Sequence, residues 1–197
     1  MNAQPWWSSE VFWKKMAIWI TGISSVILIL LTMDTLPQIS AGSKRVPAYN
    51  VINQRIDYQY DAERNFQVPV ISVKEPLFGQ ELTELQAQAM VSHGKLTVQA
   101  KNCMNCHTLL GNGAYYAPDL TKAWLDPYWG NTAVREQMMV DFIRNPSDKT
   151  HNGLGRRMPI LDITEDEARA VVAFLKWMSA IDTNGFPHNF KPIQQEN

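Results

Sequence analysis

The chain has 197 residues, of which 18 are lysine or arginine and 19 are aspartate or glutamate, giving a formal net charge of −1. This balance excludes the broad positive field that nucleic-acid binding requires, and the length suits one domain of ordinary size with a smaller part beside it. Charged residues make up 19% of the chain and seven residues are tryptophan, which is typical of a protein that spends part of its length in lipid.

The first predicted element is a membrane anchor. The 18 residues of 16–33 carry no charge, and as a helix they would measure about 27 Å, close to the ~30 Å hydrocarbon core of a bilayer. We predict a transmembrane anchor over 16–36 after a cytoplasmic tail over 1–15. A cleaved signal peptide is disfavoured, because the apolar run is too long and no small-x-small site follows closely. Aromatic residues suited to a membrane interface are Trp6, Trp7, Phe12 and Trp13.

Residues 37–80 contain many helix breakers, and we predict a linker or insertion there. Within it, the alternating pattern of 56–61 and the β-branched run of 68–73 each predict a short strand.

The remaining residues, 81–197, predict a small all-α domain with long loops and an extended C-terminal tail. One helix begins after Thr83 as its N-cap, and a shorter one follows over 135–145, where Pro146 stops it. The apolar residues at roughly helical spacing in the first of these are Leu85, Ala89, Met90 and Leu96.

The last helix begins at Thr164, which forms a capping box with Glu167. It has a single apolar stripe that consists of Ala168, Val171, Val172, Leu175 and Met178.

Both cysteines of the chain lie in a C-x-x-C-H motif formed by Cys103, Cys106 and His107. In covalent haem attachment, two thiols add across the vinyl groups and the adjacent imidazole reaches the iron. A thioredoxin-type redox pair would follow a strand, whereas here a helical pattern precedes the motif and Gly111 and Gly113 follow it. A structural zinc site would need two further ligands, and the other histidines lack zinc-finger spacing. We therefore predict one covalent haem c.

Haem attachment also bears on topology. Thioether bonds to haem are completed on the outer side of the bacterial inner membrane, so we predict that 37–80 and 81–197 are periplasmic and that the protein crosses this membrane once. Lys14 and Lys15 directly precede the span, which agrees with a cytoplasmic N-terminus under the positive-inside rule.

Met158 is the predicted second axial ligand. It lies in a loop after a glycine run and before Pro159, which favours an extended backbone. The alternative ligand is His151. The methionines that fall on helical patterns and are read as core residues are Met138, Met139 and Met178.

Two predictions concern neighbours of the haem. Arg156 and Arg157 are candidate partners of the haem propionates, because a guanidinium matches a carboxylate; two solvated surface charges are the alternative. Gly94 weakens its helix, so we expect the last helix to cross closely there, near Trp177.

The stretch "CMNCHTLLGNGAYYAPDL" resembles the haem-attachment region of the cytochrome c subunit of bacterial nitric-oxide reductase. "GRRMP" and "ITEDEARAVVAFLKWMSAIDTNGFPHN" are similar to the C-terminal half of that family. The likeness is close over about 90–190 and loose over 10–34. It implies a class I cytochrome c-like domain with His107 and Met158 as axial ligands and with Cys103 and Cys106 as haem anchors.

The resemblance implies a role as well. In this family the anchored cytochrome has no catalytic centre of its own. It takes electrons from soluble periplasmic donors and passes them to a multi-span subunit with haem b, haem b3 and a non-haem iron, which converts two NO to N2O. Gly113 and Tyr115 match residues that hold a calcium ion between the two subunits; an ordinary glycine turn is the alternative.

The segment over about 44–80 is longer than the usual connection in that family. Two other functions stay open, namely the monohaem subunit of a cbb3-type oxidase and a free membrane-anchored electron carrier.

Overall fold

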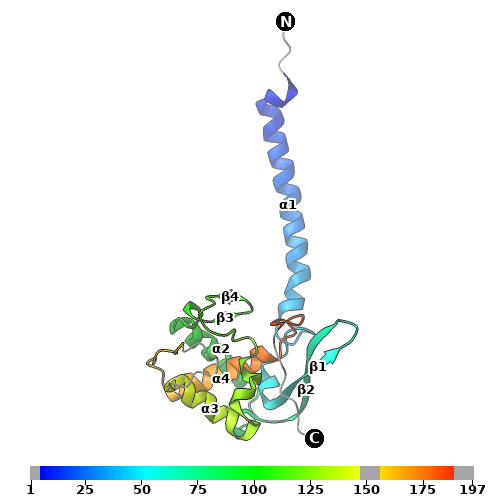
Figure 1. Ribbon diagram of the computed structural model, residues 1–197. Coiled ribbons are helices and arrows are strands. Elements are labelled where there is room, and N and C mark those ends of the chain that lie inside the picture. Colours follow the sequence, from blue (N-terminus) through cyan, green and yellow to red (C-terminus); the bar gives the residue numbers. More distant parts are fainter. Residues whose placement is uncertain (1–4, 147–155, 189–197) are drawn as a thin grey trace.

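The computed structural model describes residues 5–146 and 156–188. A long helix, α1, stands away from a globular part that contains the α-helices α2, α3 and α4 and two antiparallel pairs of strands (Figure 1). The helices are α1 (Glu10–Ile39), α2 (Glu84–Ala100), α3 (Thr132–Arg144) and α4 (Glu165–Ser179). The strands are β1 (Gln54–Asp61), β2 (Phe66–Lys74), β3 (Thr108–Leu109) and β4 (Asn112–Gly113). The fold is mostly helical, as predicted. Its small β component consists of β1 and β2, which cover the two short strands predicted within 37–80, and of β3 and β4, which were not predicted.

Helix α1 is long and apolar enough to cross a membrane, and none of its residues is buried against the rest of the chain. Its 30 residues correspond to about 45 Å, so it extends beyond the predicted span of 16–36 at both ends. Near its start, Lys14 forms an ion pair with Glu10, one turn earlier, at 2.7 Å. This pair stabilises helical structure in residues that were predicted as a cytoplasmic tail. Pro37, which the prediction placed in the linker, lies inside the last turn.

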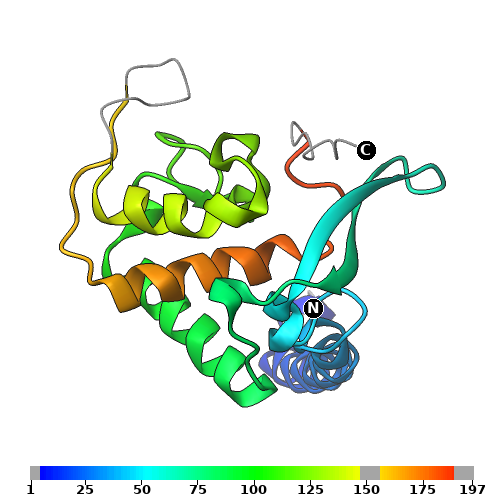
Figure 2. The same cartoon turned by 90° about the horizontal axis from the view of Figure 1, so that it is seen from below.

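Helices α2 and α4 cross closely, and Gly94 makes this possible. A Cβ atom at Gly94 would lie 1.9 Å from the carbonyl oxygen of Ala170 and 2.9 Å from the Cβ of Phe174. The predicted close crossing is therefore confirmed, but it lies about two turns earlier along α4 than Trp177. Figure 2 shows α4 between α2 and α3.

Of the four apolar residues predicted at helical spacing in α2, Met90 packs against the core and the other three do not. Leu85 and Leu96 are 77% and 61% exposed, and Ala89 is exposed as well. The side of α2 that faces the core instead carries mainly small residues, which allow α4 to approach. These are Ala87, Val91, Gly94, Thr97 and Val98.

Helix α4 follows its prediction throughout. Thr164 and Glu167 form the capping box, and all five residues of the predicted stripe are buried. Thr83 likewise caps α2, with Gln86 completing a second capping box.

The segment predicted as a linker or insertion packs against the domain. Strands β1 and β2 pair as a hairpin, and its flanks add Val51, Ile52 and Leu77 to the main core. Apolar residues of this kind have to be buried, and the turn that carries Val51 and Ile52 packs on both α2 and α4. The hairpin lies at the C-terminal end of α4 (Figure 2).

Buried polar groups fix this hairpin to α4. Tyr58 donates a hydrogen bond from its hydroxyl to the Ser179 carbonyl at 2.7 Å, and the Lys122 ammonium donates to the Ser179 and Ile181 carbonyls at 3.1 and 2.8 Å. Carbonyls at the end of a helix lack partners within the helix, and a cation there also complements the helix dipole. Farther out, Arg64 pairs with Asp182 at 2.7 Å.

Candidate haem site

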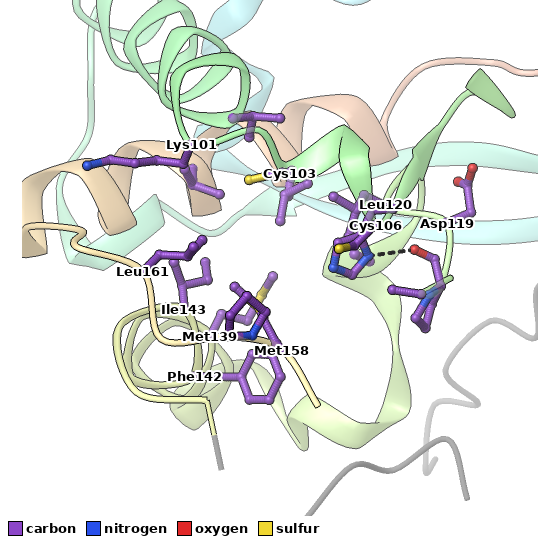
Figure 3. A pocket seen from close by; sticks show the side chains of 18 of the residues that line it. Lys101, Cys103, Cys106, Asp119, Leu120, Met139, Phe142, Ile143, Met158 and Leu161 are labelled. Carbon is purple, nitrogen blue, oxygen red and sulfur yellow. Dashed lines mark hydrogen bonds between the residues drawn. The ribbon is translucent and has the colours of Figure 1, made fainter. Parts of the chain in front are cut away.

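The two cysteines lie on a short turn directly after α2. Asn102 adopts a left-handed conformation, with φ of 55°, and ends the helix; Cys103–Asn105 then form a single 3-10 turn. The Cys106 and His107 amides both donate to the Cys103 carbonyl, at 3.2 and 3.0 Å. This turn brings both thiols to one wall of a cavity (Figure 3).

His107 is oriented by a backbone acceptor. Its Nδ1 lies 2.8 Å from the Pro118 carbonyl oxygen, which can only accept, so Nδ1 carries the proton. The other ring nitrogen, Nε2, is then left with its lone pair, as a metal ligand requires. His107 also lines the cavity, so its free nitrogen is available to a group bound there.

The loop after the motif is held by one carboxylate. Asp119 accepts from the Thr108 hydroxyl at 2.6 Å and from the Gly111 and Thr121 amides at 3.2 and 2.8 Å. Gly113 in β4 has φ of 124°, and a Cβ there would lie 2.2 Å from the His107 carbonyl oxygen. Gly113 is thus needed for the chain to pass close to the histidine backbone.

The opposite wall of the cavity comes from α3 and from the loop before α4. Figure 3 shows Met139, Phe142 and Met158 across the cavity from Cys103 and Cys106. Most of the lining is apolar, which suits a flat, largely apolar cofactor. Apolar residues that complete it include Val98, Trp129, Ile143, Val171 and Leu175.

Two of the methionines considered above line the cavity, Met158 and Met139. Met139 is buried in α3, as predicted for a core residue, whereas Met158 is partly buried in the loop before α4. Met178 is also buried, but Met138 is 38% exposed, so its prediction as a core residue was wrong. His151 lies outside the described residues.

Arg156 and Arg157 both lie at the cavity and both are exposed. Arg156 has a partner within the chain, because its guanidinium donates to the Tyr116 carbonyl and lies 4.9 Å from the centre of the Tyr116 ring. A guanidinium has five donor hydrogens, so this contact leaves donors for a propionate. The propionate contacts stay predictions for both arginines.

Neither alternative to haem fits the cysteines. Burial raises the pKa of the Cys103 thiol, whereas a reactive redox cysteine has a lowered pKa. Over 5–146 and 156–188, no group of three or more histidine, cysteine or acidic side chains is placed to hold a metal ion. Two thiols, a pre-oriented imidazole, a methionine and apolar walls fit a c-type haem.

The predicted calcium residues lie on the outside of the domain. Tyr115 is 80% exposed, and its hydroxyl donates to the Gly111 carbonyl at 3.0 Å. Calcium prefers oxygen ligands, and Gly113, which is exposed too, can offer a backbone carbonyl without a side chain beside it.

Sequence reasoning missed several residues of this site. Pro118 acts through its backbone carbonyl, which no side-chain pattern reveals. Trp129 and Phe142 were not singled out, because aromatic residues in a short turn or helix are usually core residues. Lys101, beside the motif, also lines the cavity and could have been suspected from its position.

A family model described as Cytochrome c matches residues 91–179. The chain is 36% identical to the C subunit of nitric oxide reductase from Stutzerimonas stutzeri over 120 residues, which make up 58% of this chain and 76% of that relative. The corresponding protein of Paracoccus denitrificans is 35% identical over 108 residues, 54% of this chain and 70% of the relative. That of Halomonas halodenitrificans is 33% identical over 96 residues, 48% of this chain and 62% of the relative.

Proposed function

This chain belongs to the family of nitric oxide reductase C subunits, and we propose that it is the subunit through which electrons enter such a reductase. It takes electrons one at a time from a soluble periplasmic donor and passes them to a multi-span catalytic subunit with haem b, haem b3 and non-haem iron. That partner reduces two NO to N2O. The chain itself contributes no catalytic centre.

We assign each of these cavity residues a role in holding haem c. Cys103 and Cys106 would hold the haem covalently through their thiols, and His107 and Met158 would hold its iron. When bound, haem c supplies a one-electron redox centre. The Pro118 carbonyl keeps the proton on Nδ1 of His107, and the apolar walls exclude water.

The observation that carries this proposal is that a histidine and a methionine, His107 and Met158, line one cavity. With both of these residues holding the iron, no position on it would be left for a substrate, and electron transfer would be the remaining role. Met139 is the rival for the methionine position, because it lines the same cavity.

The proposed topology places α1 in the bacterial inner membrane with its N-terminus in the cytoplasm and the haem domain in the periplasm. Lys14 and Lys15 on the cytoplasmic side and the periplasmic completion of thioether bonds support it. The Asp182 amide donates to the Arg45 carbonyl at 2.9 Å, so the packed domain already begins within a few residues of α1.

We also propose a calcium ion between this chain and its partner. Backbone oxygens of Gly113 and Tyr115 are the ligands from this side. Removing calcium with a chelator should then slow electron transfer between the subunits while the spectrum of haem c stays unchanged.

Purification of the full chain from the membrane tests the proposal. A tag on this chain should bring a multi-span partner that contains haem b and non-haem iron, and the complex should consume NO when a reduced cytochrome or dye supplies electrons. A partner that contains copper and reduces oxygen would favour the cbb3-type oxidase. A chain that is purified alone would favour a free electron carrier.

A further inference from the structure

Met158 lies in the segment 156–163, which we call the methionine loop. Hydrogen bonds hold this loop on both sides of Met158. On the N-terminal side, the Arg156 guanidinium donates to the Tyr116 carbonyl and lies over the Tyr116 ring. On the C-terminal side, the Lys101 ammonium donates to the Asp162 carbonyl. In both cases a cation binds a backbone oxygen, and Met158 lies between the two contacts.

Each of these contacts joins the methionine loop to the part of the chain that presents His107. Tyr116 is followed by Ala117, whose amide donates to the Cys106 carbonyl at 2.8 Å, and then by the Pro118 carbonyl that orients His107. Arg156 therefore ties the methionine loop to the segment that fixes the histidine.

The second contact starts beside the haem-attachment motif. Lys101 is the C-cap residue of α2 and precedes Cys103 by two positions. Its ammonium also lies 3.7 Å from the Glu167 carboxylate, and about a quarter of each of these side chains is exposed. Glu167 belongs to the capping box of α4, so Lys101 links the end of α2, the methionine loop and the start of α4.

We propose that Arg156 and Lys101 are positioning residues that act as two latches, holding the loop so that Met158 stays at the iron. The inference rests on the proposed ligation by Met158. The latches set how often the methionine leaves the iron, and hence how well the haem resists foreign ligands. Neither side chain is proposed to touch the iron or a substrate.

The two latches differ in expected strength. A hydrogen bond from a charged donor stabilises more when it is shielded from water than when it is exposed. About a quarter of the Lys101 side chain is exposed, so Lys101 is better shielded than Arg156, which is exposed. Loss of the Lys101 latch should therefore release the methionine more often than loss of the Arg156 latch.

Competition with imidazole measures this release. The full chain, purified with its partner, is oxidised and titrated with imidazole while the charge-transfer band from methionine sulfur to ferric iron is followed. Imidazole binds only when the methionine has left, so its apparent affinity rises with the fraction of detached loops. Haem content on a denaturing gel normalises the signal of each variant.

We expect Lys101→Met to raise the apparent affinity for imidazole about tenfold and Arg156→Gln to raise it about threefold. The double variant should show roughly the product, because the latches lie at opposite ends of the loop. Arg156→Lys, which keeps a charged donor, should recover most of the wild-type resistance. The matched controls are Lys95→Met on the exposed side of α2 and Arg144→Gln at the end of α3, and both should stay within twofold.

The ligation and the latches can fail separately. Met158→Ala should abolish the band and Met139→Leu should keep it; the reverse result would overturn the proposed ligation and the latches with it. If Met158 is confirmed as the ligand, but the Lys101 and Arg156 variants both bind imidazole within twofold of wild type, the latches alone are overturned.

Discussion

The two sides of α4 face different surroundings: a cavity on one side and packed protein groups on the other. On one side, Val171 and Leu175 line the haem cavity together with the attachment turn and the methionine loop; we call this the pocket side. On the other, Lys176 and the end of the helix contact β1, β2 and their flanks; we call this the hairpin side.

The hairpin side is closed by protein groups alone. The Lys176 ammonium is fully buried, donates to the Glu75 carbonyl at 3.0 Å and lies 5.0 Å from the centre of the Trp124 ring. The Trp177 indole donates to the Pro47 carbonyl at 3.2 Å, and Tyr49 stacks on it. The pocket side has apolar walls around a cavity, so its packing depends on the group that fills it. Helix α4 thus connects the hairpin side, which is packed without a cofactor, to the pocket side, whose packing a cofactor completes.

Removal of the haem should give the largest effect and separate the two sides. In a Cys103→Ser/Cys106→Ser protein we expect no haem on a denaturing gel. Hydrogen exchange should then show loss of protection around the attachment turn and in α3, while β1, β2 and the end of α4 stay protected. Equal loss of protection on both sides would contradict the claim that the hairpin side is packed independently of the haem.

Gly94 supports both sides, because it sets the distance between α2 and α4. Gly94→Leu should destabilise the protein by about 3 kcal/mol or more, since the new side chain meets the Ala170 backbone, which has little room to move. The yield of haem-loaded protein and the thermal midpoint measure this. Ala89→Leu, on the exposed side of α2, is the control and should change neither; a normal midpoint for Gly94→Leu would contradict the close crossing.

Burial of lysines should make the hairpin side sensitive to pH. Burial lowers the pKa of Lys122 to about 7 and that of Lys176 to about 8, although nearby carboxylates oppose the shift. Above these values the folded protein has released protons that the unfolded chain keeps up to its ordinary pKa near 10.5, so stability should rise as pH increases from about 7 to 10.

The slope of that rise is at most about 1.4 kcal/mol per pH unit for each lysine. Urea unfolding at several pH values measures it. Lys122→Met should lower stability at high pH, because the variant lacks the hydrogen bonds to Ser179 and Ile181, and should flatten the slope. A slope equal to that of the wild type would show that Lys122 keeps its proton in the folded state.

The smallest predicted effect concerns a single hydroxyl. Tyr58→Phe removes the hydrogen bond to the Ser179 carbonyl and should cost about 1 kcal/mol without changing the haem spectrum. Tyr60→Phe, on the exposed end of the same strand, should cost less than half as much in the same urea titration. A change in the spectrum with Tyr58→Phe would show that the two sides are more tightly coupled than proposed.

Patterns of residues close together in the sequence were enough to predict several helix ends, the buried side of α4 and the haem-attachment motif. The N-cap at Thr83, the capping box at Thr164 and the stripe of α4 depend on residues within a few positions of one another, and all three were predicted from sequence; the capping box that Gln86 completes at Thr83 was not. The cysteine motif carries its chemistry in five consecutive residues. Gly94 was predicted to mark a close helix crossing, because a glycine inside a helix lowers the stability of that helix and offers no local gain.

The missed features depend on residues far apart in the chain. Arg64 and Asp182 are 118 positions apart, so the docking of the hairpin has no local signal. The side of α2 that faces the core was misjudged because small residues, not leucines, allow a close helix to approach. The histidine acceptor and both latch acceptors are backbone carbonyls, which every residue has.

The central claim is that this chain transfers electrons and does not bind NO itself. Stopped-flow mixing of the fully reduced complex with NO tests it directly, with the absorption of haem c followed during a single turnover. We expect haem c to be oxidised as NO is consumed, with no NO adduct on haem c at any time. An NO adduct on haem c, or haem c that stays reduced while the complex turns over NO, would contradict the claim.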